Sequence, residues 1–567
     1  MQEEIRNAIS VALTATGVSV APEKIPFEFT GDLAHGDFAS SVALQYAKEA
    51  GIAPRALAEK IMQVLGANVG FTKSHIKKIE VAGPGFINFY LADSVFAAML
   101  ENVTHNPDSW GRNDLHKGER IMVEYTDPNP FKEFHIGHLM SNAIGESIAR
   151  LCEFSGAEVK RANYQGDVGP HVAKAIWGIQ KLGIDASDSA ALGKAYATGV
   201  AAYESDESAK AEIDVINTKV YNLSDESINE IYAAGRAASL KHFEEIYAML
   251  GTKFDYYFFE SETAPRGMKL VHAHEDVFEE SDGAIVYKGE QDGLHTRVFI
   301  TQKGLPTYEA KDLGLAELKN EKWPFDLSIT ITAHEQAGYF AVVLATMRKI
   351  MPAIAAKIRH VSHGMMRLAE GKMSSRTGNV ITGESLLADV AEVAKERAAE
   401  SRADDHEQLS QDIAVAAIKY QILRQTSGKD IVFDRDRALS LEGDSGPYIQ
   451  YTYARATQVV ARAKREGISV SVDTNAETIE LIRLMYRFPN AVERAGEGLE
   501  PHLIANFLIE FAAAFNRWYA EVRIVDGSTS SPQAGKNAAH KVAITEAART
   551  TLKNGLYLLG IPAPEKM

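Results

Sequence analysis

The sequence contains very little cysteine and no long hydrophobic run. Cys152 is the single cysteine among 567 residues, so neither a disulfide framework nor a zinc site built from cysteines can form. No uninterrupted apolar stretch approaches the roughly 20 residues of a membrane-spanning helix. The acidic residues 1–6 lack the pattern of a signal peptide. These absences predict a cytoplasmic protein without a membrane partner.

The balance of charge is acidic. Asp and Glu number 76 against 60 Lys and Arg, a net charge of −16, which at face value argues against a nucleic-acid partner. Binding depends on local patches, however, and 60 basic residues can form them. Hydrophobic residues make up 46% and charged residues 24%, as in ordinary globular proteins. The length suggests roughly three or four domains.

The most informative segment is residues 126–138, TDPNPFKEFHIGH. An apolar run at 121–125 predicts a strand before it, and apolar residues at helical spacing predict a helix after it. In such a βα crossing, the turn lies at the carboxyl end of the strand, where open α/β sheets bind ligands. His135 and His138 would share one face of the helix start, Gly137 would let a ligand approach the backbone, and the helix N-terminus favours an anion. Although an isolated HxxH pair is more often a surface or capping feature, this arrangement suits a phosphate chain.

A second segment with phosphate-binding chemistry lies far along the chain. Residues 371–379, GKMSSRTGN, follow a strand-like run at 358–362. Lys372 supplies a positive charge for phosphate, and Ser374 and Ser375 add hydroxyl donors. Together and in this order, the two segments resemble the HIGH and KMSKS signatures of class I aminoacyl-tRNA synthetases. The resemblance implies an ATP-binding site that involves His135, Gly137, His138, Lys372, Ser374 and Ser375.

The chain divides into sections of different pattern. Helical patterning and then a strand-rich segment at 79–91 come first, before a polar linker at 102–118. An α/β pattern starts at residue 120 and resumes at 328–351. Between these stretches lies an insertion that is first mostly helical and acidic and then strand-like. From about residue 386 nearly everything is helical. We expect an α/β plus all-α protein: a Rossmann-type parallel-sheet domain with an insertion, an α+β domain before it and a helical bundle after it.

Further strings match one family in the correct order. The chain is similar, essentially end to end, to arginyl-tRNA synthetases. Strings typical of the family's N-terminal additional domain occur at 35–39 and 83–88, and strings typical of its anticodon-binding domain occur at 441–448 and 558–567. Its catalytic domain is matched by the strings at 127–129, 135–139, 166–169 and 372–376.

The resemblance implies four domains. The first is an N-terminal additional domain that contacts the D-loop and elbow of tRNA. A class I catalytic domain with an insertion at about 173–290 follows, then a connecting helical segment and a helical anticodon-binding domain. Their expected bounds, in that order, are 1–115, 116–385, 386–440 and 441–567.

The resemblance also implies an arginine pocket. A planar guanidinium calls for carboxylates and neutral acceptors, and Tyr308 and Asp312 share a face if residues 307–318 are helical. An acidic residue at a helix start is more often a surface group that compensates the helix dipole. By resemblance, however, the family's arginine-binding positions match Glu124, Asn129, Tyr308, Asp312 and Gln336. Residues 337–338, beside Gln336, differ from what many members carry.

The implied reaction is ATP-dependent activation of L-arginine and its transfer to the 3′-terminal adenosine of tRNA(Arg). Positioning and charge stabilisation must carry it, because little covalent chemistry is asked of the protein. His135 and His138 would stabilise the phosphates, and Lys372 would neutralise pyrophosphate in a loop that closes during the reaction. Many members carry a lysine just before the first motif instead of in the second; this chain has both, so Lys132 is either a further phosphate ligand or a solvated loop residue. Magnesium is expected with ATP, held by phosphates and water, and no protein-bound metal is predicted.

Contacts with tRNA are also implied by the resemblance. Aromatic and amide side chains suit unstacked loop bases. Phe86 and Asn88 resemble the family's contacts to the D-loop, and Tyr448 and Met567 resemble parts of its anticodon-binding surface. The expected partners are tRNA(Arg), L-arginine and ATP, and we expect a monomer.

Three alternatives share some of these features. Another class I synthetase would carry both signatures but a different amino-acid pocket and C-terminal domain. A nucleotidylyltransferase of the HxGH type would use the same phosphate chemistry without tRNA, and would leave the long helical C-terminal section unexplained. The third is a non-catalytic tRNA-binding relative, against which the presence of His135, His138 and Lys372 speaks.

Overall fold

The computed structural model describes residues 1–67, 75–369, 382–525 and 532–567. The chain forms two compact units, each assembled from segments far apart in sequence. The first comprises residues 1–111, 452–491 and 510–554, and the second comprises residues 112–451, 492–509 and 555–567. In these described ranges, no helix combines the length and the apolar character needed to cross a bilayer.

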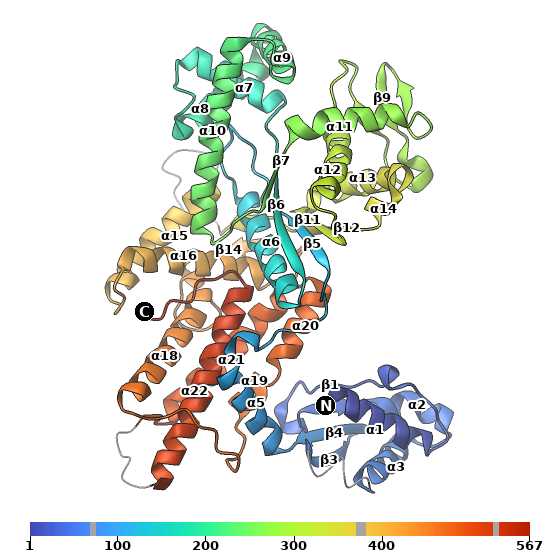
Figure 1. Ribbon diagram of the computed structural model, residues 1–567, viewed down its shortest axis with the longest axis vertical. Helices are drawn as coiled ribbons and strands as arrows, with labels where there is room; N and C mark the ends of the chain where they lie inside the picture. The colour runs from blue at the N-terminus through green and yellow to red at the C-terminus, as the bar shows by residue number, and fades with distance from the viewer. Residues whose placement is uncertain (68–74, 370–381, 526–531) are drawn as a thin grey trace. The chain divides into compact units, whose positions relative to one another are not determined.

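The N-terminal part of the first unit is an α+β fold. Its four antiparallel strands have the order β1-β2-β4-β3, and Phe38 and Phe89 are fully buried in its core. The strands are β1 Glu28–Phe29, β2 Phe38–Ser40, β3 Ile76–Ala82 and β4 Phe86–Leu91. The helices, drawn in blue in Figure 1, are α1 Gln2–Thr14, α2 Val42–Ala50, α3 Pro54–Ala67 and α5 Asp93–His105.

The second unit contains a five-stranded parallel sheet of order β12-β11-β5-β6-β7. Its strands are β5 Arg120–Glu124, β6 Glu158–Gln165, β7 Tyr256–Phe259, β11 Leu327–Ala333 and β12 Ile358–His363. Ile121, Met122 and Val123 of β5 are fully buried, as expected of a central strand covered on both faces. The chain runs outward from β5 to β7 and returns to the other side of β5 with β11. The switch point therefore lies between β5 and β11, where such sheets bind ligands.

The helices of the parallel-sheet section place side chains around this switch point. They are α6 Ile136–Phe154, α11 Glu260–Ala273, α12 Tyr308–Lys322, α13 Ala337–Ile350 and α14 Pro352–Ala355. The Ser141 hydroxyl of α6 donates to the carbonyl of Ile331 in β11 at 3.1 Å. This bond fixes the start of α6 beside the carboxyl end of β11.

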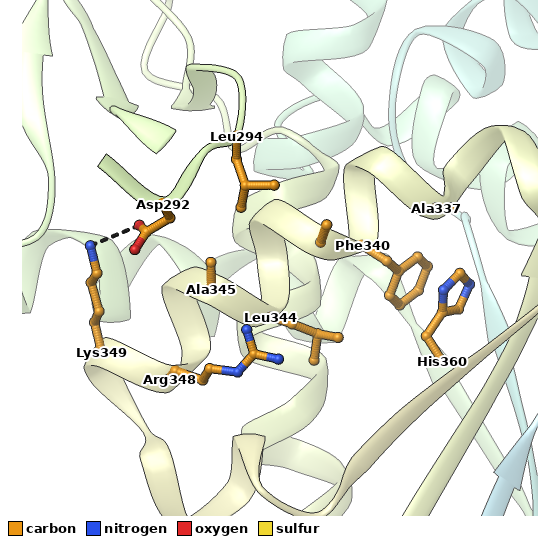
Figure 2. Close-up of a pocket in the computed structure, with 10 residues that line it drawn as sticks. Asp292, Leu294, Ala337, Phe340, Leu344, Ala345, Arg348, Lys349 and His360 are labelled. Carbon is orange, nitrogen blue, oxygen red and sulfur yellow. Dashed lines mark hydrogen bonds and ion pairs between the residues drawn. The ribbon is translucent and has the colours of Figure 1, made fainter. Parts of the chain in front are cut away.

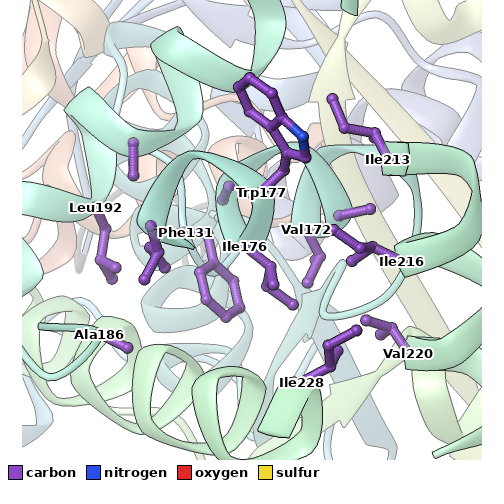
Figure 3. Close-up of a cluster of buried hydrophobic side chains, with 14 of the residues drawn as sticks. Phe131, Val172, Ile176, Trp177, Ala186, Leu192, Ile213, Ile216, Val220 and Ile228 are labelled. Atoms are coloured by element: carbon purple, nitrogen blue, oxygen red, sulfur yellow. The ribbon is translucent and has the colours of Figure 1, made fainter. Parts of the chain in front are cut away.

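A helical insertion separates β6 from β7. Its helices are α7 Pro170–Leu182, α8 Ser189–Ser205, α9 Glu207–Asn222 and α10 Glu226–Met249. They bury an apolar cluster around Trp177, Ile176 and Phe131, the last of which comes from the β5–α6 loop (Figure 3). Within the predicted insertion of about 173–290, β7 pairs with β6 and belongs to the parallel sheet. A small antiparallel sheet follows α11, with strands β8 Glu279–Ser281, β9 Ala284–Tyr287 and β10 Arg297–Ile300.

The rest of the chain is mostly helical, as predicted. A short parallel pair, β13 Met366–Leu368 and β14 Ile431–Phe433, accompanies it. The helices are α15 Gly383–Ala399, α16 His406–Leu423, α17 Arg435–Ala438, α18 Gly446–Arg465, α19 Glu480–Met485, α20 Phe488–Gly498, α21 His502–Glu521 and α22 Pro532–Leu558. The predicted fold class is confirmed. The predicted domain bounds stay a prediction.

The last residues of the chain pack on α6 within the second unit. Ser147 donates to the carbonyl of Leu558 at 2.7 Å, and Arg150 donates to that of Tyr557 at 2.9 Å. The buried ammonium of Lys419 donates to the carbonyls of Gly560 at 2.8 Å and Leu250 at 2.7 Å. The C-terminal segment thus supports the helix that starts at His135.

Candidate active site

A cavity of about 470 Å³ lies at the carboxyl ends of the parallel strands, at the switch point of the sheet. Eight residues singled out from the sequence line it: Glu124, Asn129, His135, Gly137, His138, Tyr308, Asp312 and Gln336. They come from three separate segments of the chain, which the fold brings together. Lys372, Ser374 and Ser375 lie outside the described residues.

The two histidines form a reciprocal cap at the start of α6. The backbone N–H of His138 donates to Nδ1 of His135 at 3.4 Å, and the backbone N–H of His135 donates to Nδ1 of His138 at 3.2 Å. Their rings stack with centroids 3.4 Å apart. Because both Nδ1 atoms accept hydrogen bonds, a neutral ring carries its proton on Nε2. The cap therefore leaves two Nε2–H donors for a ligand.

The charge state of the pair follows from its surroundings. Burial lowers the pKa of His138 well below its ordinary value, and the neighbouring His135 and Lys132 lower it further. The pKa of the more exposed His135 is lowered in the same direction by partial burial and by Lys132. Both rings are therefore neutral at physiological pH and act as hydrogen-bond donors.

Gly137 is required between the two histidines. A Cβ atom at this position would lie 2.9 Å from Cε1 of His135 and 3.0 Å from its Nδ1. A side chain would push the His135 ring off the first turn of α6 and break the cap. The turn combines the two donors with the positive end of a 19-residue helix, which suits a phosphate chain.

The loop between β5 and α6 is backbone-strained. Thr126, Asp127 and Phe131 have φ of 80°, 46° and 68°, a region that non-glycine residues rarely adopt. Buried hydroxyls hold the loop, since the N–H of Thr126 donates to Ser141 Oγ at 3.0 Å and that of Phe131 to Ser239 Oγ at 2.9 Å. Ser239 belongs to α10, so the insertion helps to fix this loop. Such strain is typical of ligand-binding turns.

Two buried lysine–glutamate pairs lie at the acidic side of the cavity. Lys319 Nζ lies 2.8 Å from Glu124 Oε2, and Lys311 Nζ lies 2.6 Å from Glu260 Oε2. All four side chains are at most 5% exposed. Although burial lowers the pKa of Lys311, the charges and hydrogen bonds of Glu260 and Tyr221 together outweigh it and hold that pKa above its ordinary value. Both lysines come from α12.

Asp312, also on α12, is held by a neutral donor. The Tyr339 hydroxyl donates to Asp312 Oδ2 at 2.5 Å. Burial raises the pKa of Asp312 to about 8, and the negative charges of Glu124 and Glu260 act in the same direction. The hydrogen bond from Tyr339 lowers this pKa but does not offset the rise. Asp312 is therefore largely protonated at neutral pH until a cation enters.

The other predicted substrate residues lie around the cavity mouth and the adjoining turn. Asn129 Oδ1 accepts the N–H of Gly166 at 3.2 Å, and a Cβ atom on Gly166 would lie 2.2 Å from this oxygen. Tyr308 is 57% exposed at the start of α12, and Gln336 is exposed at the end of the turn after β11. Both can therefore meet a substrate as it enters.

Lys132 is a partly buried residue of the same loop. Its ammonium lies 5.2 Å from the centroid of the Tyr196 ring in α8, and burial lowers the pKa of the lysine. The residue is thus directed toward the insertion. Its positive charge nevertheless lowers the pKa of both His135 and His138. Of the two readings of Lys132, a solvated loop residue fits this environment less well.

Sequence reasoning missed several polar residues that line the cavity. Those with phenol or carboxylate side chains include Tyr164 at the end of β6, Glu260 directly after β7, and Tyr339 in the first turn of α13. Each follows or nearly follows a parallel strand, so the rule that ligands bind at strand carboxyl ends could have found them. Glu260 was missed because the strand directly before it, β7, was assigned to the insertion and not to the parallel sheet.

A second cavity, of about 560 Å³, runs along α13 beside the first (Figure 2). Phe340 lines both cavities and stacks on His360, with ring centroids 4.2 Å apart. Arg348 and Lys349 lie further along the helix, and Lys349 pairs with Asp292 at 3.0 Å. None of the site residues predicted from the sequence lines this second cavity.

The residues predicted to contact tRNA lie in different parts of the chain. Phe86 and Asn88 line a cavity of about 500 Å³ in the N-terminal fold, where Phe86 is 40% exposed and Asn88 is buried. Tyr448 lies in the first turn of α18, and Met567 is half-buried at the chain end. Within the ranges that the structure covers, no group of three or more His, Cys, Asp or Glu residues could hold a metal ion.

Three family models together match nearly the whole chain. The models are "tRNA synthetases class I (R), catalytic domain" over residues 100–435, "DALR anticodon binding domain" over 449–567, and "Arginyl tRNA synthetase N terminal domain" over 3–91. The parallel sheet and the catalytic-domain match define a class I aminoacyl-tRNA synthetase fold.

Individual relatives agree with these matches. An arginine–tRNA ligase of Clostridium acetobutylicum is 31% identical over 552 residues and covers 94% of each chain. One of Clostridium perfringens is 28% identical over 545 residues, with the same coverage. The solved arginyl-tRNA synthetase of Thermus thermophilus has the same fold, with a TM-score of 0.79 at 24% identity and full coverage of both chains. The chain belongs to the arginyl-tRNA synthetase family.

Proposed function

We propose that the chain is an arginine–tRNA ligase, which activates L-arginine with ATP and transfers it to the 3′-terminal adenosine of tRNA(Arg). The observation that carries the proposal is one cavity with two complementary sides. Neutral histidine donors at a helix N-terminus suit the phosphates of ATP, and a cluster of carboxylates suits a cationic amino acid. Full-length relatives with this activity support the assignment.

The first step is attack of the arginine carboxylate on the α-phosphorus of ATP, with loss of pyrophosphate. Negative charge develops on the phosphate oxygens, and the Nε2–H groups of His135 and His138 stabilise it without moving a proton. Gly137 admits the phosphates to the helix start. Lys372, with Ser374 and Ser375, is assigned to the pyrophosphate, and Lys132 adds positive charge from the loop. Magnesium accompanies ATP, held mainly by phosphate and water oxygens.

Arginine is held at the acidic side of the cavity. Asp312 faces a substrate cation and ionises on binding, and Glu124 supplies a second carboxylate. Asn129, Tyr308 and Gln336 add neutral polar contacts near the mouth. Glu260 joins this set, because it is a buried carboxylate that lines the same cavity.

The tRNA is proposed to contact both ends of the chain. Phe86 and Asn88 meet the D-loop, with Phe86 presenting an exposed ring for stacking. Tyr448 and Met567 belong to the anticodon-binding surface. The division into domains at 1–115, 116–385, 386–440 and 441–567, the monomeric state and the cytoplasmic location belong to the same proposal.

The test is ATP–pyrophosphate exchange with each of the twenty amino acids, with and without total tRNA. We expect exchange with arginine alone. Exchange with a different amino acid would move the chain to another specificity of the same class. Exchange with no amino acid under either condition, from folded protein, would remove the proposed catalytic activity.

A further inference from the structure

Lys319 is a buried cation behind the substrate cavity. It lies in the last turn of α12, its side chain is 4% exposed, and its ammonium lies 2.8 Å from Glu124 Oε2. Glu124 ends the central strand β5, is equally buried, and lines the cavity. A lysine placed there loses its hydration, so its ammonium needs hydrogen-bond acceptors inside the protein, and Glu124 supplies one.

The ion pair borders two spaces. Glu124 lines the substrate cavity, whereas both Glu124 and Lys319 line a void of about 30 Å³ on the far side. The same void is lined by Asp312 and by Ser328, whose buried hydroxyl has no hydrogen-bond partner among the described residues. Lys319 therefore approaches Glu124 from behind and leaves the front of the carboxylate to the cavity.

The other charged groups of the cavity make this arrangement consequential. Glu260 is paired with Lys311, Asp312 is hydrogen-bonded to the neutral Tyr339, and Asp127 accepts the N–H of Tyr164 at 2.7 Å. Removing Lys319 would take away the hydrogen-bonded partner that holds the Glu124 carboxylate in place. The carboxylate would then be free to turn away from a substrate cation.

We propose that Lys319 is a positioning residue for arginine recognition: its ammonium holds the Glu124 carboxylate in place against the substrate cavity. The inference rests on the proposed function, because it needs a cationic amino acid in that cavity. Lys319 itself does not touch the substrate. Its effect passes through Glu124.

The experiment uses the full-length enzyme, with tRNA present. Lys319→Ala is expected to lower kcat/KM for arginine by roughly 10- to 100-fold, the range seen when a group that orients a metal ligand is removed. The loss should lie mainly in KM for arginine, with KM for ATP unchanged. Lys319→Met, which keeps the aliphatic stem, should behave alike and serves if the alanine variant folds poorly. Lys322→Ala removes an exposed lysine from the same helix and should match the parent.

Two further measurements separate positioning from a merely structural role. Propylamine replaces the atoms that Lys319→Ala removes, and the adjacent void and Ser328 hydroxyl leave it room and a partner. It should restore arginine kcat/KM in a saturable manner, whereas 1-propanol should not. In a Glu124→Gln background, the further substitution Lys319→Ala should lower arginine kcat/KM only slightly. The effects of substituting two residues that act as a unit are not additive.

Parental kcat/KM in Lys319→Ala or Lys319→Met overturns the inference. Equal recovery with propanol, or an undiminished loss in the Glu124→Gln background, does so as well. The parent enzyme is assayed in parallel. If the parent does not charge tRNA with arginine, the proposed function itself fails; if it does and the Lys319 variants match it, only the role of Lys319 fails.

Discussion

His138 combines two roles in one ring. Its Nδ1 caps the start of α6, and its Nε2–H is left for a phosphate oxygen. Asparagine can imitate the first role, because its Oδ1 lies near the position of Nδ1, but it has no atom at the position of Nε2. Substitution can therefore separate the cap from the donor.

His138→Asn should fold as the parent does and form adenylate roughly 10²- to 10³-fold more slowly, the usual effect of losing one preorganised donor. His138→Ala should lose the cap as well, at a further cost of about 0.5–2 kcal/mol in stability. Single-turnover adenylate formation and thermal unfolding measure the two effects. A parental rate in His138→Asn would show that the ring is only a cap.

In the proposed function, Asp312 couples arginine binding to proton release. Its raised pKa, about 8, means that the free enzyme carries a proton there below that pH. A bound guanidinium favours the ionised form, so the proton must leave on binding. Affinity for arginine should therefore rise with pH up to about 8 and then level off.

Calorimetry in two buffers of different ionisation enthalpy measures this proton. Nearly one proton should be released per arginine at about pH 7, and almost none at about pH 9. Asp312→Asn should abolish the release at both. Binding at neutral pH without proton release, or affinity that falls as pH rises to 8, would contradict the assignment.

Asp312→Asn also tests specificity. The variant keeps the shape and one acceptor of the side chain but cannot ionise, so a buried cation loses its partner, at a cost of about 2–5 kcal/mol. Arginine kcat/KM should fall roughly 30-fold to several thousand-fold, at about 1.4 kcal/mol per decade. Citrulline, the neutral analogue, should lose far less. Parental discrimination between the two would make Glu124 the next candidate.

Close helix packing in the insertion depends on glycine. A Cβ atom on Gly199 of α8 would lie 2.0 Å from the carbonyl oxygen of Lys174 in α7. The insertion in turn holds the β5–α6 loop through Ser239. Its helices are thus connected to the strained turn that carries the histidines.

Gly199→Ala should force α7 and α8 apart and destabilise the insertion by about 1–3 kcal/mol, the cost of overpacking. Hydrogen exchange should become faster at 170–205. Gly338→Ala, on a helix where a Cβ atom meets nothing within 4 Å, is the matched control and should be neutral or slightly stabilising. Unchanged exchange in Gly199→Ala would show that the helices can adjust without cost.

Elements with strong local patterns were predictable from sequence. The strand predicted at 121–125 and the helix after it correspond to β5 and α6. Both were predictable because the pattern of a buried strand or of a periodic helix is contained in consecutive residues. β7 was read as part of the insertion. Its partner β6 ends about ninety residues earlier, and a four-residue run cannot specify so distant a pairing.

The active cavity was only partly predictable. Four of its residues, Asn129, His135, Gly137 and His138, stood in recognisable motifs, and four more were predicted only by family resemblance. The lysines that pair with Glu124 and Glu260 had no such motif. Their partners lie 195 and 51 residues away in the chain, and only the folded structure brings each pair together.

At the scale of the whole molecule, composition gave little guidance to partners. The net charge of −16 argued against nucleic acid, whereas the chain belongs to a tRNA synthetase family. Charge acts locally, and the last turn of α18 alone carries Arg462, Lys464 and Arg465.

The central claim is that this chain attaches arginine to tRNA. The most direct test of this claim measures the transfer of labelled amino acids to total tRNA by the purified 567-residue chain, with ATP and magnesium present. We expect acid-stable incorporation of arginine that depends on ATP and disappears in Asp312→Asn at low arginine concentration. Incorporation of lysine, glutamate or methionine in place of arginine would contradict it.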